Sequence, residues 1–299
     1  MPQKKEIVYC GIGKRIGAFI IDILCTLLIA INLNNYVMMS ITSNILGTAK
    51  LQEQYKERLV DSHLYIQKEN GLCYSIDIIN DNNAMNAEEY INYLDEKLTL
   101  FYTDEDFEYS NIEYYNNLKK EATNIFVYNE ETNKYEYLEN VSINEKLSFY
   151  KNAVANTIDK VLYNDPQIIE LTNSILKNNI TSLIFSFIIS MIIFFLVIPL
   201  ISKNGSTIGK YMFKIGVIDL KTKQIAFKGQ TSLRFIIILL EVLLSLMSFG
   251  GVLLISFSFT IFTKNNSALH DLVCKTTLVD LKQYKLPPLE VEEGELVWH

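Results

Sequence analysis

The stretch GKRIGAFIIDILCTLLIAI, Gly13–Ile31, decides how the chain folds. After Lys14 and Arg15 it is apolar except for Asp22 and Thr26. About 20 apolar residues of helix cross the hydrocarbon core of a bilayer, so this stretch predicts a membrane helix. A carboxylate at that depth costs at least about 2.5 kcal/mol. We therefore expect Asp22 to face protein or water rather than lipid.

Two further apolar blocks follow at Ile180–Ile201 and Phe235–Phe262. The first of these contains no charged residue and predicts a second membrane helix. The other is interrupted by SFGG at Ser248–Gly251, so it is either one tilted helix or a hairpin of two short helices. The predicted fold class is an all-α membrane protein, a small bundle of three to four transmembrane segments.

The distribution of charge orients these segments, because basic residues near membrane spans stay in the cytoplasm. Residues 1–15 and 202–234 are strongly basic, whereas 40–178 carry 12 basic against 24 acidic residues. The first block lacks a small-residue cleavage site after it, which favours an uncleaved anchor over a signal peptide. We expect a multi-pass protein of the cell membrane with a cytoplasmic N-terminus and residues 40–179 extracytoplasmic. A basic surplus after the third block favours the hairpin.

The segment between the first two spans is too long for a simple connection and predicts a separate domain. Helical spacing, β-prone runs and a turn at Glu130–Asn133 indicate a mainly helical α+β fold. Its helices are expected near 45–65, 90–102, 112–126 and 142–162. The predicted division of the chain is 1–39, 40–179, 180–285 and an acidic tail at 286–299. The tyrosine-rich, acidic surface of this domain can bind a partner protein or cations, or it can serve only to keep the domain soluble.

No pattern for catalysis or metal binding accompanies these segments. The four cysteines, Cys10, Cys25, Cys73 and Cys274, lie far apart, which predicts neither a disulfide nor a metal cluster. The run GSTIGK at 205–210 has the wrong spacing for a phosphate-binding Walker loop. We expect no enzyme activity, no catalytic residues, no cofactor and no nucleic-acid partner.

Arg15 and Asp22 are seven residues apart, which is about two turns of an α-helix. The two side chains therefore lie on the same face of the helix. A second carboxylate, Glu241, lies at a similar expected depth in the third block. Two carboxylates at one level can share a proton or hold a cation, with coupled pKa values. The alternative is that each pairs with a basic residue or a backbone group and only fixes helix packing.

The pieces KRIGAFIIDIL, NGSTIGKYMFKIGVIDL, TSLRF and LHDLVCKTTLVD together resemble the RDD family of membrane proteins. The family is named for one arginine and two aspartates, which fall here on Arg15, Asp22 and Asp271. Other positions of the pattern match Gly205, Thr207, Gly209, Lys210, Arg234 and His270. The resemblance implies an integral membrane protein, with transport suggested. Asp271 is expected just inside the membrane at the level of Arg15, so these two residues can pair, and Lys210 can reach toward Asp22. The long insert departs from the family pattern.

Two functions remain open. The first is transport of a small ion or proton through the Arg/Asp network. So thin a bundle then needs a homo-oligomer or a membrane partner, and we see no inverted repeat of the kind common in transporters. The second is a protein anchored in the lipid bilayer whose insert recognises an extracytoplasmic protein or an envelope component.

Overall fold

A computed structural model describes residues 7–78 and 85–285; the expected acidic tail at 286–299 lies outside them. The chain divides into two compact units, Met1–Ser40 with Thr181–His299 and Ile41–Ile180. We call them the membrane unit and the insert unit. Among the residues that the structure describes, three helical stretches are long and apolar enough to cross a membrane: Ile12–Ile45, Pro166–Ile201 and Lys228–Met247.

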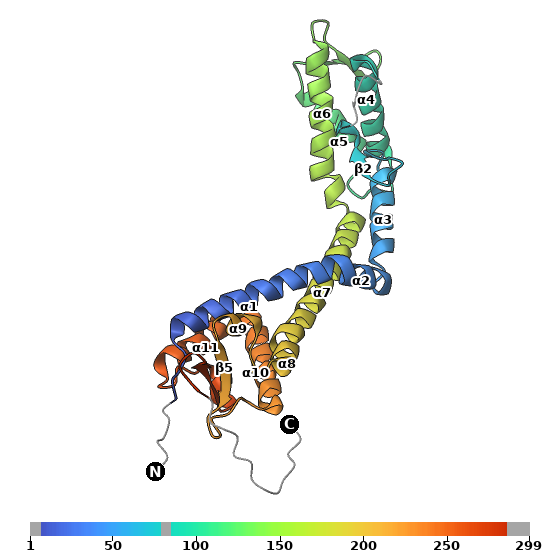
Figure 1. The fold of residues 1–299 in the computed structure, drawn as a ribbon. Coiled ribbons are helices and arrows are strands. Elements are labelled where there is room, and N and C mark those ends of the chain that lie inside the picture. Colours follow the sequence, from blue (N-terminus) through green and yellow to red (C-terminus); the bar gives the residue numbers. More distant parts are fainter. Residues whose placement is uncertain (1–6, 79–84, 286–299) are drawn as a thin grey trace, which may run out of the picture. The chain divides into compact units, whose positions relative to one another are not determined.

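The membrane unit is built from apolar helices around a small sheet (Figure 1). Its elements are α1 (Ile12–Leu33), η1 (Asn34–Met38), the end of α7 (Pro166–Ile192), η4 (Ile193–Val197), α8 (Ile198–Ile201), α9 (Ile208–Met212), β5 (Ile215–Asp219), α10 (Lys228–Met247), α11 (Gly251–Phe262), α12 (Leu269–Val273) and β6 (Thr276–Asp280). Antiparallel pairing of β5 with β6 corrects the all-α prediction for this part of the chain.

The third apolar block forms two helices, α10 and α11, rather than one. Phe249 and Gly250 both have positive φ, 49° and 89°, and this left-handed turn ends the first helix. The Ser245 hydroxyl accepts a hydrogen bond from the Leu253 N–H at 3.3 Å, which ties the start of α11 to α10. The interruption at SFGG therefore marks a helical hairpin.

The membrane unit contains an internal repeat that the sequence analysis missed. Residues 202–221, SKNGSTIGKYMFKIGVIDLK, and 263–282, TKNNSALHDLVCKTTLVDLK, are identical at seven of 20 aligned positions. Each copy folds as a loop, a five-residue helix and a five-residue strand. The strands pair symmetrically about Val217 and Leu278, as a pseudo-twofold axis requires.

Hydrogen bonds repeat along with the sequence. The Ser206 N–H donates to the Ser202 hydroxyl at 2.7 Å, and the Ser267 N–H donates to the Thr263 hydroxyl at 2.7 Å. The Lys214 carbonyl accepts from the Leu281 N–H, and its equivalent at Lys275 accepts from the Leu220 N–H. Equivalent local bonds in both copies indicate one supersecondary unit used twice.

The N-terminus completes the second copy. Ile225 bridges to Ile218 of β5, and Tyr9 bridges to the equivalent Val279 of β6. The Ala226 N–H donates to Val217 O at 2.9 Å, as the Cys10 N–H donates to Leu278 O at 2.9 Å. In each half a long helix follows, α10 or α1. The two halves are thus equivalent, but the second takes its last helix from the start of the chain.

The insert unit has its own helices and two small hairpins. Its elements are the end of α2 (Met39–Ile45), α3 (Thr48–Asp61), β1 (Tyr65–Gln67), β2 (Cys73–Ser75), η2 (Ile76–Ile78), α4 (Ala87–Thr103), α5 (Ile112–Glu121), β3 (Phe126–Asn129), β4 (Lys134–Tyr137), α6 (Ile143–Lys160), η3 (Leu162–Asn164) and the start of α7. The helical α+β architecture and the turn between β3 and β4 agree with the sequence prediction.

Three details of the insert unit differ from expectation. The helix expected near 112–126 ends at Glu121, and Phe126 is the first residue of β3. The helix expected near 45–65 begins only at Thr48. Gly47 has a φ of 67°, and this left-handed residue interrupts the helix between α2 and α3. The hairpin of β1 and β2 was not predicted; its strands have three residues each, too few for a period-2 pattern.

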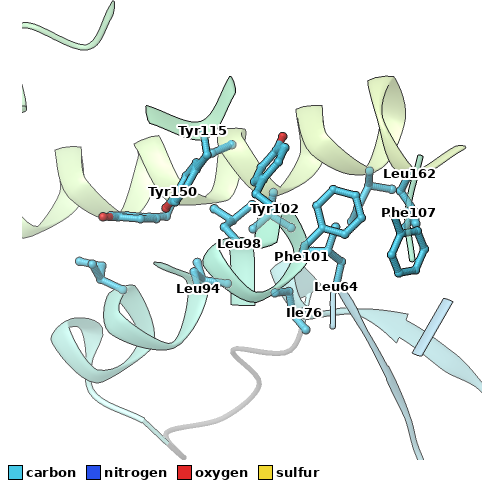
Figure 2. Packing of buried hydrophobic residues seen from close by; sticks show 14 of the residues in the cluster. Leu64, Ile76, Leu94, Leu98, Phe101, Tyr102, Phe107, Tyr115, Tyr150 and Leu162 are labelled. Atoms are coloured by element: carbon cyan, nitrogen blue, oxygen red, sulfur yellow. The ribbon is translucent and has the colours of Figure 1, made fainter. Parts of the chain in front are cut away.

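The core of the insert unit is aromatic (Figure 2). Tyr102 stacks on Tyr115 with ring centroids 5.4 Å apart, and its hydroxyl bonds to Thr157 at 2.9 Å. Leu94 and Leu98 of α4 are fully buried. Every described residue of this core belongs to the insert unit, so the insert is a domain by its packing.

Candidate functional site

One face of α1 is buried and carries its polar residues. The buried positions are Arg15, Ala18, Asp22, Thr26 and Ala30, at spacings of three and four residues. This spacing places them on one stripe of a helix. The side chains between them are apolar and mostly exposed, as expected for a helix whose other faces meet lipid.

Arg15, near the start of α1, is hydrogen-bonded to the second copy of the repeat, residues 263–282. Its Nε donates to Cys10 O at 3.1 Å, Nη2 donates to Leu278 O at 3.1 Å, and Nη1 donates to Asn266 O. Nη1 also lies 3.7 Å from Oδ2 of Asp271. A planar guanidinium can satisfy several acceptors at once, and here it joins three separate segments.

Asp271 is fully buried between two arginines. Its Oδ1 lies 2.7 Å from Nη2 of Arg234, whose Nη1 donates to the Thr276 hydroxyl at 3.2 Å. Desolvation would raise the pKa of Asp271, but Arg234, His270, Arg15 and Lys210 together lower it below its ordinary value. The expected pairing of Arg15 with Asp271 is present.

Asp22 is held by the N-terminal end of α9. Its Oδ2 accepts from the Thr207 hydroxyl at 2.5 Å, and its Oδ1 accepts from the Gly209 N–H at 2.7 Å. These donors satisfy the carboxylate and tie α1 to α9. The expected direct contact with Lys210 is replaced by these two hydrogen bonds.

Gly209 permits this contact. A Cβ at position 209 would overlap the backbone carbonyl of Ala18 and lie 3.0 Å from Oδ1 of Asp22. Only glycine therefore lets α9 approach α1 closely enough for the Gly209 N–H to reach Asp22. Gly205, earlier in the same loop, has a φ of 60° and forms the turn that precedes this approach.

Lys210 lies half-buried near the other charged groups. Burial, with the nearby Arg234, lowers the pKa of Lys210 to about 8, although Asp22 and Asp271 act in the opposite direction. Within the described part of the chain it makes no ion pair within 4.0 Å. Lys210 therefore contributes charge to the network without a direct partner.

Glu241 pairs with His270 rather than with Asp22. Its Oε2 lies 3.2 Å from His270 Nδ1, and His270 Nε2 lies 3.8 Å from Oδ1 of Asp271. The other oxygen, Oε1, is buried with no hydrogen-bond partner among the described residues. Of the two alternatives for the intramembrane carboxylates, the contacts favour separate pairing, with Asp22 on a backbone N–H and Glu241 on a basic residue.

Hydroxyl groups continue the polar interior along α7. Ser182, Ser186 and Ser190 are buried at a four-residue spacing, and Asn34 Oδ1 accepts from the first two at 2.8 and 3.4 Å. The Ser190 hydroxyl is buried without a partner in the described structure. Buried Ser256 and Thr260 add hydroxyls on α11. Sequence reasoning missed these residues because serine alone gives no strong signal in an apolar run.

No cluster of three or more metal-ligating side chains occurs among residues 7–78 and 85–285. The four cysteines, all in the described region, are free. The buried carboxylates and arginines offer acid–base and electrostatic chemistry, and among the described residues Oε1 of Glu241 and the Ser190 hydroxyl have no hydrogen-bond partner.

Taken together, the described residues form a mostly helical, membrane-associated protein with three apolar helices long enough to span a membrane. The model of the RDD family matches residues 159–275, so the chain carries an RDD domain over that region, and RDD domains are membrane-associated. The match includes Lys210, Arg234, Glu241 and Asp271. Arg15 and Asp22 lie outside it, yet the structure joins them to it. No curated protein and no solved structure matches the chain.

Proposed function

We propose that this RDD-family membrane protein moves a proton or a small monovalent cation through the polar interior of its membrane unit. The observation that carries the proposal is the pair of Glu241 and His270. Glu241 is 5% exposed on an apolar helix and has one unpaired carboxylate oxygen. A buried ionisable group on a membrane helix is typical of an ion or proton path.

The other charged residues have different roles in this proposal. Arg15 and Asp22 are fully hydrogen-bonded, so they hold α1 in place rather than carry the ion. His270 is more exposed than Glu241 and connects it to Asp271, which provides a route for a proton toward the surface. The buried hydroxyls of α7 offer further polar contacts within the same unit.

The test is a flux assay in proteoliposomes with a pH-sensitive dye inside and Na⁺ or K⁺ gradients applied. Wild type is expected to change the internal pH, and Glu241→Gln to abolish the change, because glutamine can still bond to His270 but cannot carry a proton. Glu170→Gln, on an exposed carboxylate of the insert unit, is the matched control. No flux in wild type, or equal flux in Glu241→Gln, would contradict the proposal.

A second function, recognition of an extracytoplasmic partner by the insert unit, is favoured by one observation. A groove of about 510 Å³ lies along the start of α7, with Tyr109, Glu170 and Lys177 among its lining residues. Its mixed charge suits a polar peptide segment better than a lipid chain. Binding partners captured by the full-length protein and lost in Tyr109→Ala with Glu170→Ala would support this function; capture unchanged by the double variant would exclude the groove.

A further inference from the structure

The two halves of the membrane unit present the same kind of surface twice, on the short helices α9 and α12. In α9, Tyr211 and Met212 are 68% and 63% exposed; at the equivalent positions of α12, Leu272 and Val273 are 39% and 51% exposed. Each helix begins seven residues after an apolar helix ends, at Ile201 or Phe262. Both short helices therefore lie where apolar helix gives way to polar loops.

A lysine follows each of these helices. Lys214 and Lys275 are exposed, and their φ angles are 55° and 54°. The left-handed conformation favours glycine or asparagine and costs other residues about 1 kcal/mol or more. Both copies nevertheless keep lysine while most neighbouring positions differ. A strained position that is lysine twice indicates that the charge is needed there.

Exposed apolar residues beside a lysine fit one kind of surface, the boundary between acyl chains and headgroups. Apolar side chains enter the acyl region while the ammonium group stays among the headgroups, and anionic lipids add attraction. Further exposed lysines occur at equivalent loop positions, Lys203 and Lys264. Of the two aspartates at equivalent strand positions, Asp280 is paired with Lys14. Asp219 keeps its charge and is held within its own turn by Gln230 and the Lys221 and Thr222 N–H groups.

We propose that α9 with Lys214 and α12 with Lys275 form two equivalent binding sites for anionic phospholipid headgroups, one in each half of the membrane unit. These sites are separate from the charge network, which lies on the other face of α9 at Gly209. The proposal does not depend on whether the protein transports an ion.

The experiment uses the full-length protein in neutral detergent and titrates phosphatidylglycerol or phosphatidylcholine while the bound lipid is counted by native mass spectrometry. Wild type is expected to retain two phosphatidylglycerol molecules in preference to phosphatidylcholine. The double variant Lys214→Asn with Lys275→Asn is expected to lose about fivefold in phosphatidylglycerol affinity at each site. Each single variant is expected to weaken one site.

Asparagine is chosen because it tolerates the left-handed conformation, so the variant should unfold at the same or a higher temperature in phosphatidylcholine. Lys50→Gln with Lys120→Gln removes the same charge from exposed positions of the insert unit and should leave lipid binding unchanged. No preference for phosphatidylglycerol in wild type, or the same preference in the asparagine variant, would overturn the proposal. Displacement of the lipid by equimolar inorganic phosphate would also overturn it, by showing a site for a free anion.

Discussion

Asp271 is the residue whose loss should cost the membrane unit most. Asp271→Asn leaves Arg15 and Arg234 buried without their carboxylate, and breaking a buried pair from one side costs about 3–5 kcal/mol. We expect a matching drop in the free energy of unfolding, measured by chemical denaturation in detergent. Asp159→Asn, at an exposed position, is the control. A loss of less than about 1 kcal/mol would mean that the pairs contribute little net stability.

The pH dependence of this contribution follows from the sign of the shift. The pKa of Asp271 in the folded protein is lower than its ordinary value of 3.8. Its stabilising contribution is therefore complete above that value and is lost as the pH falls through the lowered pKa. The free energy of unfolding of Asp271→Asn should lack this part of the acid-induced loss.

Lys210 shows the opposite behaviour. Its pKa is about 8 in the folded protein against 10.5 ordinarily, so the unfolded chain binds more protons between these values. The free energy of unfolding should then rise as the pH increases from about 8 to 10.5. Lys210→Met should raise stability at pH 7 and flatten that rise, which thermal unfolding at several pH values would measure. Lower stability in Lys210→Met at pH 7 would show that its attraction to Asp22 and Asp271 outweighs its burial.

At the scale of elements, the contact of α1 with α9 depends on a single missing side chain. Gly209→Ala places a methyl group against the Ala18 carbonyl, so α9 must move away and Asp22 loses its backbone donor. Overpacking of this kind costs about 1–3 kcal/mol. Gly13→Ala is the matched control, because nothing lies within 4 Å of a Cβ there. Similar melting temperatures for the two variants would contradict the close approach.

The elements also show what a sequence can reveal. Hydropathy located the apolar helices, because length and lack of charge are properties of each segment alone. The family pattern indicated Arg15, Asp22 and Asp271, and the similar expected depth of Arg15 and Asp271 indicated their pairing. The partners of Asp22 were not predicted, because Thr207 and Gly209 meet it only through the fold. The repeat was present in the sequence as KN-x-S and DLK in both copies, but most positions between them differ, so the similarity is weak until the fold places the copies together.

At the scale of the whole molecule, the repeat explains why the family match and the folded unit differ. The match begins at residue 159 and ends at 275. However, β6 forms its isolated bridge with Tyr9, and Asp271 pairs with Arg15 of α1, so both contacts come from residues before the match. The RDD domain is therefore completed by residues that precede the insert in the chain. The insert interrupts the sequence of the membrane unit, and the contacts described for the charge network join residues of the membrane unit.

This organisation predicts that the insert can be removed. Asn34 and Ser182 are hydrogen-bonded at 2.8 Å within the membrane unit, so the ends left by deleting 41–180 lie close enough for a short linker. Eight Gly/Ser residues span about 16 Å on average, enough to close the gap. We expect this shortened chain to insert into membranes and to unfold cooperatively in detergent.

A chain that instead lacks residues 1–40 but keeps the insert should fail to fold its membrane unit, because Arg15, Asp22 and the bridge at Tyr9 are gone. Gel filtration and thermal unfolding of both chains distinguish the outcomes, and a folded membrane unit without residues 1–40 would show that the second half of the repeat does not need α1.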